Sequence, residues 1–306
     1  MEKSIRVISE YLPEHIASPM KRALNACCDR VTEIVMRTDR PLCIYETNRM
    51  YFITENGFLT DTYLSDGLLA VNAKEMEETV LRLCDYSVYA YQNEINSGFI
   101  TVSGGIRVGL CGQAILKDGL VSNVRYISSL CFRVARDVKG CADSLLSKIE
   151  PLRGVLICGA PGSGKTTVMR DMARQLSYRY RVSVADERYE LSACSRGVMG
   201  FSLGLCDVFA GYPKGLAAQQ AIRSTAPQII VCDELGDRSD VEMLSYSLRC
   251  GVSFIATVHA SSMQDLRSRM IAKDLINTGA FRYIVFLKAD VPGRVDRIYE
   301  MCDTHG

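Results

Sequence analysis

The stretch ICGAPGSGKTT, residues 157–167, places three glycines and a proline between an apolar run and a lysine. Glycine adds no side chain to a core and loses much conformational freedom on folding, so a glycine cluster indicates backbone that must approach another group closely. Residues 159–166 match the pattern G-x-x-x-x-G-K-[ST], in which backbone amides and a lysine surround the phosphates of a nucleotide. A bound phosphate group is therefore the first expectation for this stretch.

The segments around the loop supply the context that this pattern requires. The run GVLICG before it predicts a buried strand, and the helix expected from Lys165 carries Val168, Met172 and Leu176 on one face. A glycine-rich turn that binds nothing is the alternative, but it explains neither the lysine nor the hydroxyls that follow it. The residues expected to bind the nucleotide are Gly159, Ala160, Pro161, Gly162, Ser163, Gly164, Lys165, Thr166 and Thr167.

Within this loop the side chains have separate expected roles. Lys165 would contact the β- and γ-phosphates, Thr166 would bind Mg²⁺ through its hydroxyl, and Thr167 would support the α-phosphate. Backbone N–H groups at the start of the helix would point at the phosphates, where the helix dipole also favours negative charge. The chain has no downstream N/T-K-x-D element that would read guanine, so ATP is the expected nucleotide.

Short apolar runs follow the loop at intervals, at residues 181–187, 228–234, 252–260 and 282–288. Their lack of alternation indicates burial on both faces of a parallel sheet. Helical stretches separate them, and one of these opens on the capping-box pattern Ser239-x-x-Glu242. Strands that alternate with helices predict a doubly wound α/β domain, a P-loop NTPase with a mainly parallel sheet flanked by helices.

Two acidic residues, Asp233 and Glu234, follow the apolar run at 228–232. Asp233 fits a Mg²⁺ partner, usually through water, and Glu234 fits the general base that polarises the attacking water. Taken alone, the pair would be better interpreted as an acidic turn that caps a helix. The phosphate loop at 159 makes the catalytic interpretation the stronger one.

Asp186, Glu187 and Glu190 end another apolar run, near the edge of a parallel sheet where such folds bind ligands. A solvated turn balanced by Arg188 is the alternative for these three acids. His259 ends the strand expected at 252–260, where a neutral imidazole would sense the γ-phosphate or its departure. An ordinary core or surface histidine explains it equally well.

Four arginines are candidates for an arginine finger, which stabilises transition-state charge on the γ-phosphate from another domain or subunit. Arg223 precedes the Asp233 strand, while Arg107, Arg133 and Arg136 come from the first half of the chain. Each one is, by itself, better explained as a surface ion-pair residue.

The first half of the chain mixes helix and strand patterns and predicts a smaller α+β domain. Residues 98–116 alternate apolar and polar on both sides of Gly104-Gly105, which favours a hairpin over a ligand loop. We place the boundary near residue 145, so that 1–145 form the N-terminal domain and 146–306 the P-loop ATPase domain. Helices are expected within 1–28 and from the capping box Asn72-x-x-Glu75, and strands at 31–38, 41–54 and 127–136.

Composition limits the function classes that fit. The 36 basic and 35 acidic residues give a net charge of +1, and no basic stripe is interleaved with aromatics, so no nucleic-acid partner is expected. The 13 cysteines are irregularly spaced and are interpreted as reduced core thiols, with no zinc site expected from only 3 histidines. No apolar run approaches the roughly 18 residues of a membrane helix, so any membrane contact is expected to be indirect.

The motifs also resemble a known family. In chain order, ICGAPGSGKTTVMRDMARQL, VADERYEL, CDVFAGYPKGLAAQQAIRSTAPQIIVCDELGD and GVSFIATVHA are similar to the stage III sporulation protein AA family of secretion-type ATPases. Upstream, TEIVMRTDRP, SVYAYQNEINSGFITVSGGIRVGLCGQA and FRVARDVKGCADSLL resemble the N-terminal region of the same family. The resemblance runs from about residue 30 almost to the C-terminus.

The resemblance implies a RecA-like P-loop NTPase whose relatives are hexameric motors of type II and type IV secretion. It also implies a cytoplasmic location in the mother cell of an endospore-forming bacterium, docked beneath a membrane channel complex that leads to the forespore. It assigns Lys165 and Thr166 to the phosphate loop, Asp233 and Glu234 to the second-strand motif, and His259 to the histidine box. The acidic box it implies contains Asp186, Glu187 and Glu190.

One position departs from the expected family pattern. Ile106 stands in GGIRVG where a histidine is expected, so a functional role for that hairpin tip is in doubt. Two functions follow for the whole chain. The first is an ATP hydrolase that works with channel-complex membrane proteins as a homo-oligomer, with a hexamer expected. The second is a nucleotide-gated scaffold that binds ATP and assembles partners with negligible hydrolysis.

Overall fold

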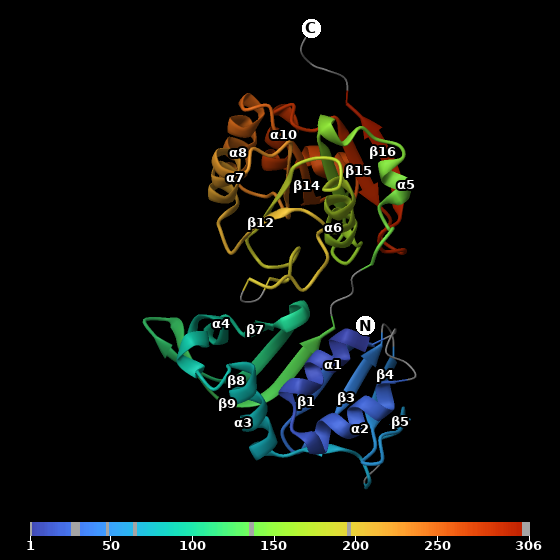
Figure 1. The fold of residues 1–306 in the computed structure, drawn as a ribbon, viewed down its shortest axis with the longest axis vertical. Coiled ribbons are helices and arrows are strands. Elements are labelled where there is room, and N and C mark those ends of the chain that lie inside the picture. Colours follow the sequence, from blue (N-terminus) through green and yellow to red (C-terminus); the bar gives the residue numbers. More distant parts are fainter. Residues whose placement is uncertain are drawn as a thin grey trace. The chain divides into compact units, whose positions relative to one another are not determined.

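The structure, a computed structural model, describes residues 2–25, 31–46, 49–63, 66–134, 138–194 and 197–301. Two compact units divide the chain, Met1–Arg136 with Ala193–Gly200 and Asp137–Ser192 with Phe201–Gly306 (Figure 1). Among the described residues, no helix has both the length and the apolar composition that a bilayer crossing needs.

The first unit contains a seven-stranded antiparallel sheet with the order β5-β4-β3-β1-β9-β8-β7. A separate antiparallel pair is formed by β2 (Arg40–Pro41) and β6 (Ala70–Val71). The sheet strands are β1 (Val31–Arg37), β3 (Cys43–Glu46), β4 (Arg49–Ile53), β5 (Leu59–Thr60), β7 (Phe99–Val102), β8 (Ile106–Lys117) and β9 (Leu120–Arg133). The helices are α1 (Glu2–Tyr11), α2 (Glu14–Leu24), α3 (Ala73–Leu83) and α4 (Gln92–Asn96).

Most local expectations for this unit are confirmed, with two refinements. The capping box at Asn72 and Glu75 starts α3 as predicted. The helical segment at 1–28 divides at Pro13, which lacks the N–H that would continue a helix. The strand expected at 41–54 is a hairpin of β3 and β4.

The glycine pair turns a hairpin as the alternation predicted, because β7 and β8 pair antiparallel and Val102 lies opposite Ile106 at the turn. Gly104 and Gly105 have φ angles of +75° and +73°, in the left-handed region that favours glycine. Ile106, which follows them, is fully buried in the core of this unit. The Ile106 side chain, which stands where a histidine is expected, therefore packs in the core.

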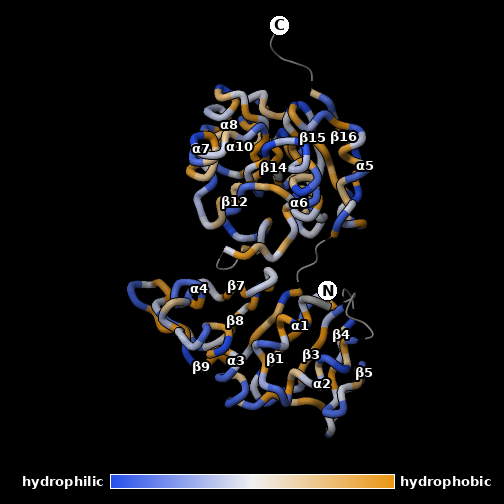
Figure 2. The backbone as a smooth tube through the Cα atoms, in the orientation of Figure 1, coloured by the Kyte–Doolittle hydropathy of each residue, from blue (hydrophilic) through white to orange (hydrophobic). Residues whose placement is uncertain are grey.

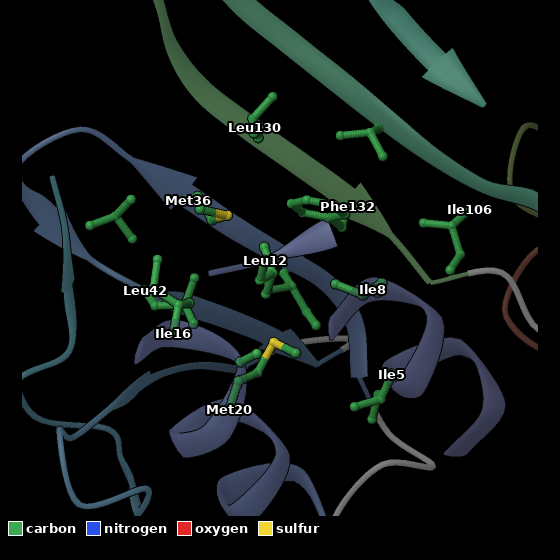
Figure 3. Packing of buried hydrophobic residues seen from close by; sticks show 14 of the residues in the cluster. Ile5, Ile8, Leu12, Ile16, Met20, Met36, Leu42, Ile106, Leu130 and Phe132 are labelled. Carbon is green, nitrogen blue, oxygen red and sulfur yellow. The ribbon is translucent and has the colours of Figure 1, made fainter. Parts of the chain in front are cut away.

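The core of the first unit lies between its helices and one face of the sheet. Figure 3 shows Ile8 of α1, Leu12 of the turn after it and Met20 of α2 on the same side of the sheet as Phe132 and Ile106 from the strands. The helical spacing of apolar residues in α1 and α2 and the alternation in β8 and β9 therefore serve one common core.

The second unit contains a seven-stranded sheet with the order β12-β11-β13-β14-β10-β15-β16. All neighbouring pairs from β12 to β15 are parallel, and only β16 runs antiparallel at the edge, so the sheet is mainly parallel as expected but mixed. The strands are β10 (Val155–Gly159), β11 (Val182–Asp186), β12 (Asp207–Ala210), β13 (Ile229–Cys232), β14 (Ser253–His259), β15 (Tyr283–Leu287) and β16 (Val295–Glu300).

Alternate residues of the central strands pack against helices on opposite faces of this sheet. Ile157 and Val231 contribute to the core shared with α5 (Asp143–Leu146) and α6 (Lys165–Leu176), whereas Cys158 and Cys232 contribute to the core on the other face. Burial on both faces explains the uninterrupted apolar runs, which colour β14 as hydrophobic in Figure 2. That second face carries α7 (Lys214–Ser224), α8 (Arg238–Arg249), α9 (Met263–Ser268) and α10 (Met270–Asn277).

The start of α8 differs from the prediction, because Ser239 and Glu242 do not form its capping box. The box is Asp237 with Asp240, two residues earlier, and the Asp237 carboxylate accepts from the Asp240 amide at 3.0 Å. Asp237 has the extended backbone of an N-cap, while Ser239 already lies inside the helix and donates its hydroxyl to Asp237.

The expected domain boundary near residue 145 also differs from the division by contacts, in which the second unit begins at Asp137 and Ala193–Gly200 belong to the first. Ala142 and Leu145 are buried in the core beside α6, and the Ala142 amide donates to the Asp171 carboxylate at 2.9 Å. Asp171 also accepts from the Arg174 guanidinium at 2.6 Å. Whether the two units fold as independent domains stays a prediction.

The Asp171 carboxylate is expected to contribute to the free energy of unfolding in a way that depends on pH. Burial alone would raise the pKa of this carboxyl, but hydrogen bonds from Ala142 and Arg174 outweigh burial and hold the pKa below its ordinary value. The unfolded chain therefore binds more protons below about pH 4, and the ionised form stabilises the fold above that pH. We expect Asp171→Asn to lower the free energy of unfolding by roughly 1–3 kcal/mol at pH 7.

The same substitution should cost progressively less as the pH falls, since acid removes the charge from the native carboxylate as well. Urea unfolding followed by circular dichroism between pH 3 and pH 7 measures this difference. A destabilisation that stays constant over the whole range would contradict the assignment.

Candidate functional site

The backbone of the phosphate-loop segment requires its glycines. The loop leaves β10 at Gly159 and enters α6 at Lys165, with φ angles of +76° at Gly162 and +87° at Gly164. A Cβ atom on Gly164 would lie 3.0 Å from the Gly293 Cα, and the Gly293 amide donates to the Ser163 carbonyl at 2.8 Å. The turn between β15 and β16 therefore packs directly against the loop and fixes its shape.

An open cleft of about 360 Å³ lies at the carboxyl edge of the sheet. It brings together residues from the phosphate loop, the end of β13 and the end of β14, as the sequence predicted. Glu190 of the acidic segment reaches the same cleft. The lining residues are Pro161, Gly162, Gly164, Lys165, Thr166, Thr167, Glu190, Asp233, Glu234, Thr257 and His259.

Lys165 is buried, with its ammonium nitrogen 3.0 Å from each of the carbonyl oxygens of Gly159 and Ala160. The same nitrogen lies 3.1 Å from the His259 Nδ1. Burial lowers the pKa of Lys165 below its ordinary value, an effect that the carboxylates of Asp233 and Glu234 oppose. Because an ammonium has three donors, a phosphate oxygen would have to replace one of these protein acceptors.

Thr166 and Asp233 meet at the end of the loop, where the Thr166 hydroxyl donates to the Asp233 Oδ2 at 2.8 Å. The Asp233 Oδ1 accepts from the Thr257 hydroxyl and from the Glu234 amide. Hydroxyl and carboxylate oxygens are the ligands that Mg²⁺ prefers in proteins.

A buried polar atom without a hydrogen-bond partner lies in the same loop, the Ser163 hydroxyl oxygen. A partner for such a group stabilises it by removing the cost of desolvation. The oxygen pair at Thr166 and Asp233 and the glycine backbone of the loop therefore fit a metal ion and a phosphate group.

Glu234 has a φ of +50°, in the left-handed region of backbone conformation. Its half-exposed carboxylate contacts both Arg188 and His259. Its Oε2 lies 2.7 Å from the Arg188 guanidinium, and its Oε1 lies 3.1 Å from the His259 Nε2. His259 thus stands between Lys165 and Glu234. These two contacts fit a neutral imidazole that accepts at Nδ1 and donates from Nε2.

The acidic segment does not act as one group. Asp186 is buried, and its carboxylate accepts from the backbone amides of Glu190, Leu191 and Ser192. These bonds hold the turn that follows β11, so Asp186 shapes the segment instead of facing the cleft. Glu187 is exposed and lines a small hollow beside the cleft, together with Glu190 and Glu234.

Within the second unit, the candidate Arg223 does not line the cleft. Arg223 is exposed in the last turn of α7, at the opposite end of that helix from Lys214, which contacts the Glu234 carbonyl. In the first unit, Arg107 stacks on the Phe99 ring at 3.5 Å and Arg133 lies 3.4 Å from the Glu33 carboxylate. Arg136 lies outside the described residues.

Two functional contacts were missed at the sequence level. The Thr257 hydroxyl donates to the Asp233 carboxylate. Cys232 pairs with Ala256, so the next residues of β13 and β14, Asp233 and Thr257, lie side by side. Aligning the ends of the two apolar runs in the sequence would have suggested this contact. Lys214 donates to the backbone carbonyl of Glu234 from the start of α7. Nothing local in the sequence marks Lys214, because its partner is a main-chain atom.

The fold is that of solved secretion-type ATPases, which are RecA-like α/β proteins. The ATPase DotB of Yersinia pseudotuberculosis matches with a TM-score of 0.58 and 18% identity, over 96% of this chain and 81% of that chain. The pilus retraction motor PilT, solved with bound ADP, matches with a TM-score of 0.52 and 14% identity, over 84% of this chain and 74% of that chain.

The family is narrower than this fold class. The family model for sporulation stage III, protein AA, matches residues 8–305, and the chain belongs to that family. Stage III sporulation protein AA of Bacillus subtilis (strain 168) is 32% identical over 303 residues, which span 96% of this chain and 94% of that protein. The family resemblance is confirmed, and it begins earlier than the expected residue 30.

Asp186 and Asp233 should respond differently to loss of charge. Asp186→Asn replaces a carboxylate that holds three backbone amides, so we expect a loss of roughly 1.5–3 kcal/mol in the free energy of unfolding. Asp233→Asn should leave stability closer to the native value and weaken Mg²⁺-dependent nucleotide binding at least about tenfold. Thermal unfolding and titration with a fluorescent ATP analogue, with and without Mg²⁺, measure both effects; the reverse pattern would refute the two roles.

Proposed function

We propose that the chain is a Mg²⁺-dependent ATPase that energises a sporulation-associated, secretion-like transport or channel complex at the membrane between mother cell and forespore. The observation that carries this proposal is the 2.8 Å hydrogen bond between the Thr166 hydroxyl and the Asp233 carboxylate, with Glu234 beside them at the cleft. This arrangement supports hydrolysis because a hydroxyl and a carboxylate that would bind Mg²⁺, with a candidate base beside them, lie at the end of one phosphate loop.

Binding of the substrate would be the work of the phosphate loop. Backbone amides of residues 162–166 and the positive end of α6 would orient the triphosphate, and Lys165 would exchange a carbonyl contact for a phosphate oxygen. Thr166 and Asp233 would hold Mg²⁺, which when bound neutralises charge on the phosphate oxygens. Thr167 lines the same cleft and would support the α-phosphate.

Hydrolysis would depend on Glu234, whose carboxylate would accept the proton of the water that attacks the γ-phosphorus. This role requires Glu234 to release the Arg188 guanidinium, since that group occupies the Glu234 Oε2 at 2.7 Å. His259 contacts both Lys165 and Glu234, so a change at the phosphate would reach the base through one imidazole. Glu187 is exposed, so it would take part in the reaction from the rim of the cleft.

The cellular part of the proposal is supported by membership of the sporulation family and by the secretion-ATPase fold. It comprises a mother-cell cytoplasmic location, indirect contact with the membrane through channel-complex proteins, and a homo-oligomer, with a hexamer as the expected form. An arginine supplied in trans, Arg223 among the candidates, would belong to that oligomer.

A second function, a nucleotide-gated scaffold, is favoured by one observation. The Glu234 carboxylate is held by Arg188 at 2.7 Å and by His259 at 3.1 Å, contacts that would keep it from the attacking water and slow hydrolysis. Phosphate release measured with and without the membrane partners separates the two functions. Acceleration by the partners supports the motor, whereas unchanged slow release with nucleotide-dependent assembly supports the scaffold.

Two substitutions test the hydrolase directly. Lys165→Ala should abolish nucleotide binding and turnover, because it removes the cation of the phosphate loop. Glu234→Gln should lower turnover at least about 100-fold while ATP still binds, because an amide cannot accept the proton. Phosphate release and equilibrium nucleotide binding are the measurements.

Glu242→Gln, at an exposed position on α8, is the matched control and should retain native turnover. Native turnover in Glu234→Gln would rule out Glu234 as the base. Native nucleotide affinity in Lys165→Ala would remove the phosphate-loop assignment itself.

A further inference from the structure

The backbone at Glu234 is held from two directions in a conformation that it would not favour by itself. Its φ of +50° lies in the left-handed region, which a residue with a Cβ atom adopts only when its surroundings determine it. The backbone angles set the direction of the Cα–Cβ bond and limit the allowed rotamers, so whatever fixes this φ also limits where the Glu234 carboxylate can lie.

The first set of contacts comes from β14. The Glu234 amide donates to the Thr257 hydroxyl at 2.8 Å and to the Asp233 Oδ1 at 2.9 Å. The next amide, that of Leu235, donates to the Thr257 carbonyl at 2.8 Å. The Leu235 amide and the Glu234 carbonyl belong to one trans peptide and point in opposite directions. The bond to Thr257 therefore directs the Glu234 carbonyl away from β14, where a second set of contacts receives it.

The second set of contacts comes from the helices α7 and α8. The Lys214 ammonium donates to the Glu234 carbonyl at 2.8 Å and to the Asp240 Oδ2 at 3.1 Å. The same Asp240 oxygen accepts from the amides of Gly236 at 2.7 Å and Asp237 at 3.2 Å. Lys214 therefore joins the carbonyl of Glu234 to the capping box of α8.

Burial makes these contacts effective. The side chain of Asp240 is 2% exposed and that of Lys214 is 15% exposed, so water competes weakly for either group. Removing only one of the two would leave a charge without its partner in a dry environment. The pair therefore defines one position for the Glu234 carbonyl.

We propose that Lys214 is a positioning residue for the hydrolytic reaction, which holds the Glu234 peptide in its left-handed conformation and so aims the carboxylate at the site of the attacking water. The inference rests on the proposed ATPase function for its kinetic consequence. Its structural consequence, an ordered segment from Glu234 to Asp237, is independent of that function.

A purely structural role for the ion pair between α7 and α8 would give a different result. Lys214 lines the small hollow beside the phosphate cleft and not the cleft itself, so its loss should leave nucleotide binding unchanged. A misaimed base lowers kcat while KM stays near its native value, since the interaction acts in the transition state. General loss of stability would lower the fraction of active protein and the melting temperature together.

The experiment compares four variants of the full chain. Lys214→Met removes the donor, Lys214→Arg keeps a cation and donors at that position, and Lys214→Met/Asp240→Asn removes both charges so that none is left buried alone. Lys273→Met, at an exposed position on α10, is the matched control. Each is measured for ATP turnover, nucleotide affinity, melting temperature and amide hydrogen exchange of residues 233–237.

We expect Lys214→Met and the double variant to lower kcat about 10- to 100-fold with KM within about threefold of native, and to speed exchange selectively at 233–237. Lys214→Arg should recover most of the turnover and Lys273→Met all of it. If Lys214→Met does not fold, the double variant decides the question.

Native kcat in the double variant, or unchanged exchange at 233–237, would overturn the positioning role. Lack of turnover by the native protein, with its membrane partners present, would instead overturn the proposed ATPase. Hydrogen exchange would then still decide whether Lys214 orders the Glu234 segment, so the two failures are distinguishable.

Discussion

The hydrogen bond between Thr166 and Asp233 is the contact on which the site depends, because it joins two segments 67 residues apart across an intervening strand. The strand order places β14 between β10 and β13. Groups on β14 consequently lie between the phosphate loop and the acidic pair, where Thr257 contacts Asp233 and His259 contacts both Lys165 and Glu234. Topology, more than any one motif, determines which of these groups can meet.

The register of the parallel strands determines which residues of neighbouring strands lie side by side at the carboxyl edge. Gly159 pairs with His259 and Cys232 with Ala256, so β14 extends beyond β13 by the length needed for Thr257 to reach Asp233. Continuous apolar runs in all three strands maintain this register by filling both faces of the sheet. The packing of the core thus positions the polar edge.

Much of this arrangement could be predicted from the sequence, since strong local patterns carry it. The glycines of the loop, the apolar strands and the acidic pair after β13 each depend on a few adjacent residues. Other features could not be predicted because no local pattern marks them. The Asp186 carboxylate bonds the backbone of its own following turn, Lys214 contacts a main-chain carbonyl, and the edge strand β16 has no apolar run of its own.

The three aspartates Asp186, Asp233 and Asp240 show why residue type and position do not separate these roles. Backbone amides converge on Asp186 and Asp240, and each carboxylate then fixes a turn. The Oδ2 of Asp233 instead accepts from a threonine hydroxyl, which is itself an oxygen ligand and can turn toward a metal ion. An amide proton cannot be moved aside in this way without breaking the turn, so among these carboxylates the Asp233 Oδ2 is the oxygen best suited to the proposed Mg²⁺ site.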